Sequence, residues 1–437
     1  MSTKTTQSAH HKEKEMSSTT EDTVSDLSSD GIEGEGIEPA DTGADSTIVD
    51  DSSSSDSIMK QAFGFMKNHL KVGSDMTKMP IPATFVAPMS FLVAIQQHSA
   101  IYTHLLMAAD SIKDPEQRFL QVLKYHLTWP KMFFPKNPLN PILGEVYENE
   151  VQHIDEKTNQ PIEGDRTKFI SEQISHHPPV SCFHFHNEKH GIQYTARQQI
   201  TPVFKGKHIR ADMDVKSTIT LKNHNETYYN DKFPDGFLRI LRWKFEFTGK
   251  YHFVCPESGY SAVINFKDKP ILGGKWHDMH VLVCKGNESL YELNGTHVDV
   301  LNITSLKDKS TSVFINYATM RTEAIIEEPF ETLKENNSIK VWKGVADSFA
   351  KKDGRRAGLE KQKIEEAQRK KAKAVLTQNP NFIWEPVHFE HYTPENPVIP
   401  DHRYTNKHQQ DTTTTAKQDC QQQQQSSSQQ QPIEQLA

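Results

Sequence analysis

Between about residues 165 and 325, apolar and polar positions alternate with a period of two. Short runs rich in β-branched and aromatic residues are separated by Gly, Pro, Asn and Asp at hairpin-like intervals, among them VSCFHFH, IQYTARQ, IRADMDV, STITL and MHVLVC. Many short strands without intervening helices predict an antiparallel sheet or barrel. A large barrel encloses a cavity, and such a cavity is a ligand site by default.

Helical patterns come before this region. Residues 57–73 place four large apolar side chains on one stripe, which predicts a short amphipathic helix. That helix is either part of the core, a mobile lid or a helix lying on a membrane surface. A proline-rich extended connector follows, and then helices over 89–109 and 115–128, the second capped by Asp114 ahead of Pro115.

After the alternating region, helices are predicted over 339–349 and 359–376. The second, LEKQKIEEAQRKKAKAVL, is highly charged and has no broad apolar face. Lys361, Glu365 and Arg369 follow one another at intervals of four, so they lie along one side of this helix. Its composition alone favours a solvated helix with Glu–Lys pairs.

Composition divides the chain into three parts. Residues 1–56 are rich in Ser, Thr, Asp and Glu, and residues 401–437 are rich in Thr, Gln and Ser. Neither segment can bury enough apolar surface to offset the entropy of ordering, so both are predicted to be disordered tails. The first holds 3 Lys and Arg against 14 Asp and Glu, which leaves a mildly basic body at 57–400. Such a body suits an anionic membrane surface or a phosphorylated ligand, although a net charge of this size is also ordinary for a domain of this length.

The cysteines and the hydropathy indicate the compartment. The four cysteines form no CxxC pair and no disulfide framework, which fits a reducing compartment. No signal peptide is recognisable, and no run of about 18 apolar residues is present that could span a bilayer. Any membrane contact is therefore expected to be peripheral, and the protein is expected in the cytosol as a monomer.

Two proline-containing motifs carry the candidate chemistry. In EQISHHPP, at 172–179, the two prolines fix a stiff, non-helical corner. Such a corner can direct His176 and His177 toward one ligand; the alternative is a β-turn whose histidines are only surface polar groups. In NPLNPILGE, at 137–145, prolines again exclude a helix and Gly144 permits a sharp turn. A rigid loop with exposed amides beside Lys136 is a reasonable cradle for a phosphate group.

Other chemistries have weaker support. His176, His177, Cys182, His184 and His186 could form a zinc site, but no zinc-finger spacing and no HExxH motif occurs, so structural histidines are favoured. The chain also lacks GxSxG, P-loop and GxGxxG motifs, so no catalytic residue and no cofactor are predicted. The basic and aromatic run LRILRWKF fits a strand better than a nucleic-acid surface.

These motifs together resemble the oxysterol-binding protein family of lipid-transfer proteins. The likeness covers about residues 57–392 and includes DMTKMPIPATFVAPMSFL, EEAQR and FIWEPVHF, in the family's order. It resembles a short member without PH or ankyrin domains. The resemblance implies a mainly β fold of the α+β class: a large, incomplete antiparallel β-barrel around a hydrophobic tunnel. It implies a lid at 57–81, helices at 82–130, the barrel at 131–325 and a C-terminal helical region at 326–400.

The resemblance also implies a lipid headgroup site and a lid. The expected headgroup residues are His176, His177, Lys136, Asn137, Leu139, Asn140, Lys361, Glu365 and Arg369. The expected lid residues at the tunnel mouth are Met76, Thr77, Lys78, Met79, Pro80 and Ile81. The family usually has a basic residue where this chain has Asn137, and here Lys136 stands one position earlier.

The leading hypothesis is a lipid-transfer protein that binds phosphatidylinositol 4-phosphate and a sterol in one lidded tunnel and exchanges them between membranes. The sequence leaves the second cargo open between a sterol, phosphatidylserine and none. A second hypothesis is a lipid-sensing adaptor that regulates membrane traffic through its tails without bulk transfer. Deleting both tails separates them, because transfer should survive and adaptor function should not. The third hypothesis, a metal-dependent enzyme built on the histidine cluster, requires stoichiometric zinc.

Overall fold

The computed structural model describes residues 71–73, 86–131, 137–240, 244–269, 273–380 and 382–405. The predicted lid residues 76–81, Lys136, the segment 1–56 and almost all of the predicted helix at 57–73 lie outside these residues. So do residues 406–437 of the second predicted tail.

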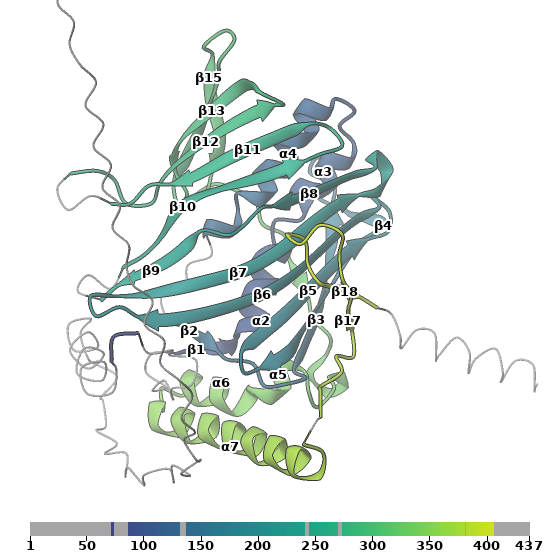
Figure 1. The fold of residues 1–437 in the computed structure, drawn as a ribbon. Helices are drawn as coiled ribbons and strands as arrows, with labels where there is room; N and C mark the ends of the chain where they lie inside the picture. Colours follow the sequence, from purple (N-terminus) through teal and green to yellow (C-terminus); the bar gives the residue numbers. More distant parts are fainter. Residues whose placement is uncertain are drawn as a thin grey trace, which may run out of the picture. The chain divides into compact units, whose positions relative to one another are not determined.

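Fourteen strands within the described residues form one antiparallel sheet (Figure 1). From edge to edge they run β15-β14-β13-β12-β11-β10-β8-β7-β6-β5-β4-β3-β16, and β9 pairs with both β7 and β10. The two edge strands, β15 and β16, do not pair with each other, so the barrel is incomplete, as predicted. The strands are β3 Val146–Ile154, β4 Pro161–His176, β5 Pro179–Asn187, β6 Ile192–Phe204, β7 His208–Leu221, β8 Glu226–Asn230, β9 Asp235–Arg239, β10 Lys244–Cys255, β11 Tyr260–Phe266, β12 Asp278–Lys285, β13 Glu288–Thr296, β14 Val300–Ser305, β15 Thr311–Asn316 and β16 Ile325–Ile326.

Several strands are longer than the short runs in the sequence indicated. The runs IRADMDV and STITL, predicted as two strands, are one strand, β7. Alternate residues of β7 from Val215 to Leu221 are buried, and the polar Ser217 occupies one of these inward positions. Its hydroxyl donates to Asn230 Oδ1 at 2.8 Å, so a polar residue is accommodated inside the sheet without breaking the alternation.

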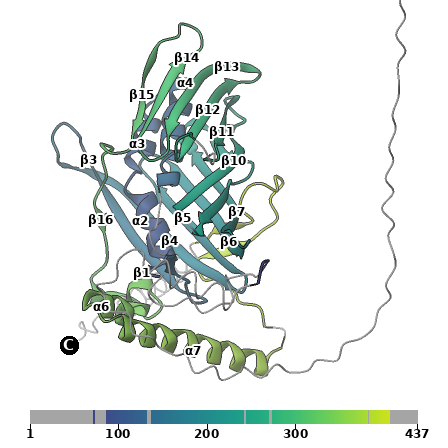
Figure 2. The same cartoon turned by 90° about the vertical axis from the view of Figure 1, so that its left-hand side faces the viewer.

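Among the described residues, three helices precede the large sheet. They are α2 (Phe91–Ala100), α3 (His104–Asp110) and α4 (Pro115–His126), followed by the 3₁₀ turn η3 (Trp129–Lys131). α2 packs against β3 and β4 (Figure 2). α4 begins as predicted, with Asp114 Oδ1 accepting from the Gln117 amide at 2.9 Å and Pro115 in the first turn.

The single helix predicted at 89–109 is wrong. A short strand, β1 (Val86–Ser90), occupies its start, and a turn at 101–103 separates α2 from α3. The Thr103 hydroxyl donates to the Ala100 carbonyl at 2.8 Å, and Glu323 Oε2 accepts from the His104 amide at 3.1 Å, which caps α3 from a distant segment. A cap supplied from more than 200 residues away leaves no local signal in the sequence.

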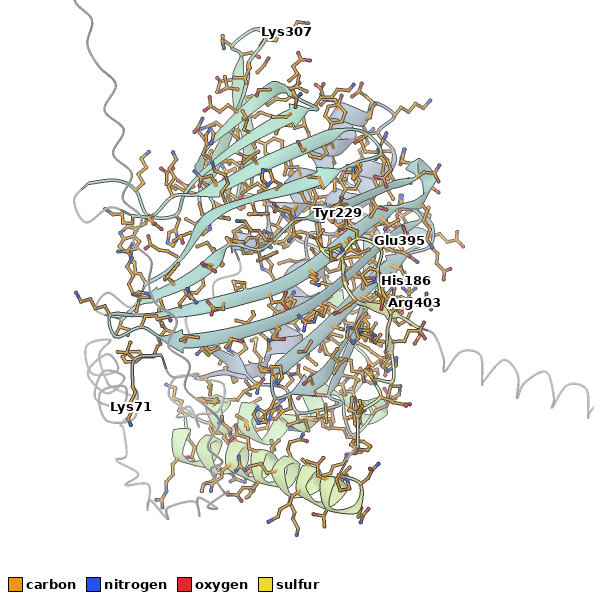
Figure 3. The ribbon with its side chains drawn as sticks, viewed as in Figure 1. Lys71, His186, Tyr229, Lys307, Glu395 and Arg403 are labelled. Atoms are coloured by element: carbon orange, nitrogen blue, oxygen red, sulfur yellow. The ribbon has the colours of Figure 1, made fainter. Side chains whose placement is uncertain are left out.

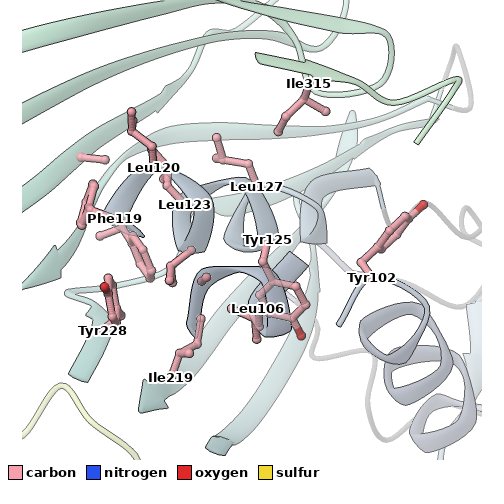
Figure 4. Close-up of a cluster of buried hydrophobic side chains, with 14 of the residues drawn as sticks. Tyr102, Leu106, Phe119, Leu120, Leu123, Tyr125, Leu127, Ile219, Tyr228 and Ile315 are labelled. Carbon is pink, nitrogen blue, oxygen red and sulfur yellow. The ribbon is translucent and has the colours of Figure 1, made fainter. Parts of the chain in front are cut away.

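The largest hydrophobic core lies between α3, α4 and the concave face of the sheet (Figure 4). Phe119 and Leu123 of α4 are fully buried, and the Phe119 ring stacks on Tyr228 of β8 with centroids 6.0 Å apart. Beside this core, Arg118 Nε donates to Glu226 Oε2 at 2.7 Å, and both side chains are buried. The helices therefore fill one part of the barrel and anchor it through a buried ion pair.

A histidine joins α3 to the hairpins of the sheet. His190 lies between two carboxylates, with Nδ1 3.0 Å from Asp110 Oδ2 and Nε2 3.0 Å from Asp165 Oδ2. Hydrogen bonding to Asp165, with a further contribution from Asp110, raises the pKa of His190. The charged imidazolium is therefore the form that this contact stabilises.

The part of the C-terminal region that the structure describes contains three helices and a hairpin. The helices are α5 (Ser338–Val341), α6 (Lys343–Ala350) and α7 (Gly354–Gln378), and the 3₁₀ turn η6 (Phe330–Thr332) precedes them. A further 3₁₀ turn, η4 (Lys222–His224), lies between β7 and β8 of the sheet. β17 (Phe389–His391) and β18 (His402–Tyr404) form a two-stranded hairpin that the helical prediction for 326–400 missed, and β18 lies beyond the predicted boundary at 400. Among the helices described, none is long and apolar enough to cross a membrane.

Candidate functional site

The corner predicted from EQISHHPP is the turn between β4 and β5. His176 is the last residue of β4, Pro179 is the first of β5, and the bond between His177 and Pro178 is cis. His176 is half-buried and His177 is exposed, with ring centroids 4.6 Å apart. His176 Nδ1 donates to the carbonyl of Pro141 at 3.0 Å, which leaves Nε2 as the ring atom available to another group.

The second motif lies directly against this corner. NPLNPILGE begins as β2 (Asn137–Leu139), which pairs in parallel with β1, and then turns at Gly144. The Gly144 amide donates to the Gln173 carbonyl and the Gln173 amide donates to the Glu145 carbonyl, both at 2.9 Å. Two sequence motifs about 30 residues apart are thus joined by backbone hydrogen bonds.

Gly144 is required at this turn for two reasons. Its φ is +76°, a conformation that costs a side chain of ordinary chirality about 1–2 kcal/mol. A Cβ there would also lie 2.6 Å from a ring carbon of Trp384. The FIWEPVHF segment therefore packs against the turn of NPLNPILGE.

Glu145 is a buried carboxylate that holds the surrounding elements together. Oε1 accepts from the hydroxyl of Ser90, at the end of β1, and from that of Ser338 in α5, the latter at 2.7 Å. Oε2 accepts from the indole of Trp342 at 2.9 Å and from the amide of Ile142 at 3.0 Å. Burial raises the pKa of Glu145, and these four donors act in the opposite direction.

Glu172 plays a similar part in the first motif. Its two carboxylate oxygens accept from the backbone amides of Val387 at 2.9 Å and His388 at 2.8 Å. Burial raises the pKa of Glu172, while the amide donors lower it. The sequence alone indicates no role for Glu145 or Glu172, because an acidic residue inside each proline-containing motif is its only signal there.

The charged helix α7 forms the third side of the site. Ala357 and Ile364 pack with Leu139 of β2 and with Trp342 and Val345. This packing places α7 beneath the NPLNPILGE loop (Figure 1). Composition favoured a solvated helix, and that is only partly right, because one face is packed and Lys361 is buried.

Two charged residues of α7 act on the histidine corner. Lys361 Nζ pairs with Glu365 Oε1 at 2.6 Å. Burial, followed by the charge of His177, lowers the pKa of His176; Glu365 raises it and Arg369 lowers it further. The face predicted from the spacing of four is therefore within electrostatic reach of His176.

The expected headgroup residues of the second motif are arranged unequally. Asn137 and Asn140 are exposed, whereas the Leu139 side chain is fully buried in the packing beneath the loop. Leu139 can thus contribute to a ligand site only through its backbone. Lys136 and the lid residues 76–81 lie outside the described part of the chain, and a headgroup-binding role for all of these residues stays a prediction.

The histidine cluster of β5 has structural partners. His184 Nδ1 lies 3.0 Å from the Thr195 hydroxyl, and its ring stacks on Tyr404 of β18 with centroids 4.3 Å apart. Burial lowers the pKa of His184 to about 3. Within the described residues, no group of three or more His, Cys, Asp and Glu side chains is arranged to hold a metal ion.

Sequence comparison agrees with the resemblance. The family model described as oxysterol-binding protein matches residues 63–353. Oxysterol-binding protein 6 of Dictyostelium discoideum is 67% identical over 385 residues, 87% of this chain and 87% of that protein. Oxysterol-binding protein-related protein 8 of Homo sapiens is 30% identical over 322 residues, 71% of this chain and 35% of that protein.

Solved structures share the fold at lower identity. The Osh1 ORD domain in complex with cholesterol matches with a TM-score of 0.62 and 18% identity, over 79% of this chain and 86% of that one. The Osh3 ORD of Saccharomyces cerevisiae in complex with PI(4)P matches with a TM-score of 0.56 and 17% identity, over 79% and 89%. The matched length, the order of the motifs and the sheet all agree, and the chain belongs to the oxysterol-binding protein family.

Proposed function

We propose that this protein is a lipid-transfer protein that binds phosphatidylinositol 4-phosphate and a sterol in one lidded tunnel and exchanges them between membranes. Membership of the family and the shared fold support lipid binding as its general activity. Related domains have been solved with a sterol and with PI(4)P, which supports these two lipids as cargo here. The proposal involves no covalent step, because the cargo is only moved.

The observation that carries the proposal is the convergence of three segments at one end of the sheet. His176 donates to Pro141 of the NPLNPILGE loop, the loop is hydrogen-bonded to β4, and α7 packs beneath the loop with Lys361, Glu365 and Arg369 along one side. We expect this arrangement to present the His176 imidazole and the Arg369 guanidinium to one ligand. A phosphomonoester, which carries up to two negative charges, is the ligand that such donors favour.

The protonation state of His176 fits a phosphate ligand. Burial and neighbouring positive charge lower its pKa, so the ring is mainly neutral at neutral pH in the free protein. A phosphate placed beside the ring would favour the charged form, so binding is expected to take up a proton. A sterol has no charge and would leave the ring neutral.

Residues 76–81, with the helix before them, would close the tunnel, and Lys136 would supply a cation next to Asn137. The protein would act as a monomer in the cytosol and bind anionic membranes peripherally, with its acidic and Gln-rich tails outside the lipid-binding domain.

Extraction of lipid from liposomes tests the headgroup site. The double variant His176→Ala/His177→Ala should lose extraction of labelled phosphatidylinositol 4-phosphate and retain binding of a fluorescent sterol. A matched variant, His252→Ala/His280→Ala, removes two histidines of β10 and β12 and should behave like the natural protein. Normal phosphoinositide extraction by the first variant would overturn the headgroup assignment.

A further inference from the structure

The C-terminal half of α7 projects from the packed body. Its buried residues, Ala357 and Lys361, both lie in the first third of the helix. From Arg369 to Ala374 every residue is exposed, and Leu376 is 50% exposed. This half of the helix therefore takes no part in the hydrophobic core, and its side chains are exposed on the protein surface.

The two halves of α7 also differ in charge. The first half contains the ion pairs Lys361–Glu365 and Lys363–Glu360. Between Glu366 and Glu385 the sequence has four cations and no carboxylate, the cations being Arg369, Lys370, Lys371 and Lys373. No ion pair of these four is found in the described part of the chain. Their charge is thus not neutralised by a direct ion pair.

Exposed apolar side chains follow these cations in the chain. Leu376 is followed by Phe382, which is 40% exposed, and Ile383, which is 82% exposed. Arg369, Lys373 and Leu376 are spaced by four and three residues, so they share one face of the helix. Single exposed apolar residues are common on protein surfaces, but three next to unpaired cations form a combination suited to the headgroup and acyl boundary of a bilayer.

We propose that this surface, Arg369–Gln378 with Phe382 and Ile383, docks the protein on an anionic bilayer; we call it the α7 tip. The four cations match the negative potential of such a surface, and the apolar side chains can enter its outer layer. The inference rests on the proposed function in one respect: Arg369 belongs to the proposed headgroup site. Docking through the same helix would therefore bring that site to the membrane that holds the cargo.

Vesicle co-sedimentation tests this surface without the cargo. The probe is phosphatidylcholine vesicles containing phosphatidylserine and no phosphoinositide, at low and at high salt. The variant Lys370→Gln/Lys371→Gln/Lys373→Gln leaves Arg369 intact. Each cation near an anionic surface is worth about a fivefold change in affinity, so the triple variant should bind about a hundredfold more weakly at low salt.

A matched control removes the same charge elsewhere. Lys157, Lys189 and Lys307 are exposed residues of strand-connecting loops, and Lys307 lies at the end of the molecule opposite α7 (Figure 3). Replacing these three by Gln should leave vesicle binding within a few-fold of the natural protein. Equal losses in the two triple variants would show only an effect of net charge and would overturn the proposal.

Two further variants test the apolar contribution to vesicle binding and separate vesicle binding from headgroup binding. Ile383→Ser should weaken binding to the same vesicles, and this loss should persist at high salt because it does not depend on charge. His176→Ala/His177→Ala should bind these phosphoinositide-free vesicles normally, so failure of the headgroup proposal is separable from failure of this one. Bilayer docking is refuted if the natural protein does not bind the vesicles. It is also refuted if the protein binds polyglutamate beads through the α7 tip but does not bind vesicles.

Discussion

Replacing Gly144 by Ala tests whether the turn between the two motifs controls the candidate site. The positive φ alone costs about 1–2 kcal/mol for a residue with a Cβ. The new Cβ would also lie 2.6 Å from the Trp384 ring, and relieving such overpacking typically costs a further 1–3 kcal/mol. We therefore expect a total loss of about 2–5 kcal/mol in the free energy of unfolding, measured by urea denaturation.

Gly259 provides the control. It has nearly the same φ, +75°, and a Cβ there would meet nothing within 4 Å. Gly259→Ala should therefore cost only the backbone term, about 1–2 kcal/mol. Since the Gly144 amide is bonded to Gln173 in β4, Gly144→Ala should also weaken phosphoinositide extraction, whereas Gly259→Ala should not.

Removal of the ring makes the test specific. In a Trp384→Ala background, Gly144→Ala should cost no more than Gly259→Ala, because the steric contact is gone. If Gly144→Ala and Gly259→Ala destabilise the natural protein equally, the packing of FIWEPVHF against the NPLNPILGE turn does not determine stability there and the reasoning fails.

Three other predictions concern stability. Glu172→Ala removes the acceptor of two part-buried backbone amides and should cost about 2–5 kcal/mol by urea denaturation, whereas a loss below about 0.5 kcal/mol would contradict the assigned contacts. Arg118→Ala strands the buried Glu226 carboxylate and should cost about 3–5 kcal/mol in the same assay; Arg118→Met/Glu226→Leu should cost much less, and equal costs would refute the ion-pair account. The pKa of His190 is raised in the folded protein. The contribution of this histidine to the free energy of unfolding is therefore complete below its unfolded pKa of about 6.5, and it is lost as the pH rises through the pKa of the folded protein. The stability difference between the natural protein and His190→Gln should therefore shrink from about pH 5.5 to pH 8.5, and a constant difference would refute this assignment.

Local patterns in the sequence were sufficient for several features. The period of two predicted an antiparallel sheet, because alternate side chains of a strand face opposite sides. Asp114 ahead of Pro115 located the start of α4, since capping depends only on neighbouring residues. The prolines of EQISHHPP predicted a non-helical corner, because proline restricts its own φ and the preceding residue wherever it stands.

Other local patterns misled because distant contacts outweighed them. Glu323 caps α3 and allows a break that the apolar run at 89–109 does not indicate. Ser217 extends β7 because Asn230 of a neighbouring strand accepts its hydrogen bond. The hairpin of β17 and β18 is held partly by Glu172, which binds the amides that lead into it, so the helical prediction for that region failed.

The sequence by itself determined the strand and helix periods, the stiff histidine corner and the motifs that resemble the family. Only the tertiary structure decided how these parts meet: residues 141, 176 and 369 lie far apart in the chain, and folding brings them to one end of the sheet. It also decided that Glu145 and Glu172 are buried anchors and that the second half of α7 is exposed. The physical reason is that periodicity and turn chemistry act over a few residues, whereas burial and long-range hydrogen bonds depend on which segments pack together.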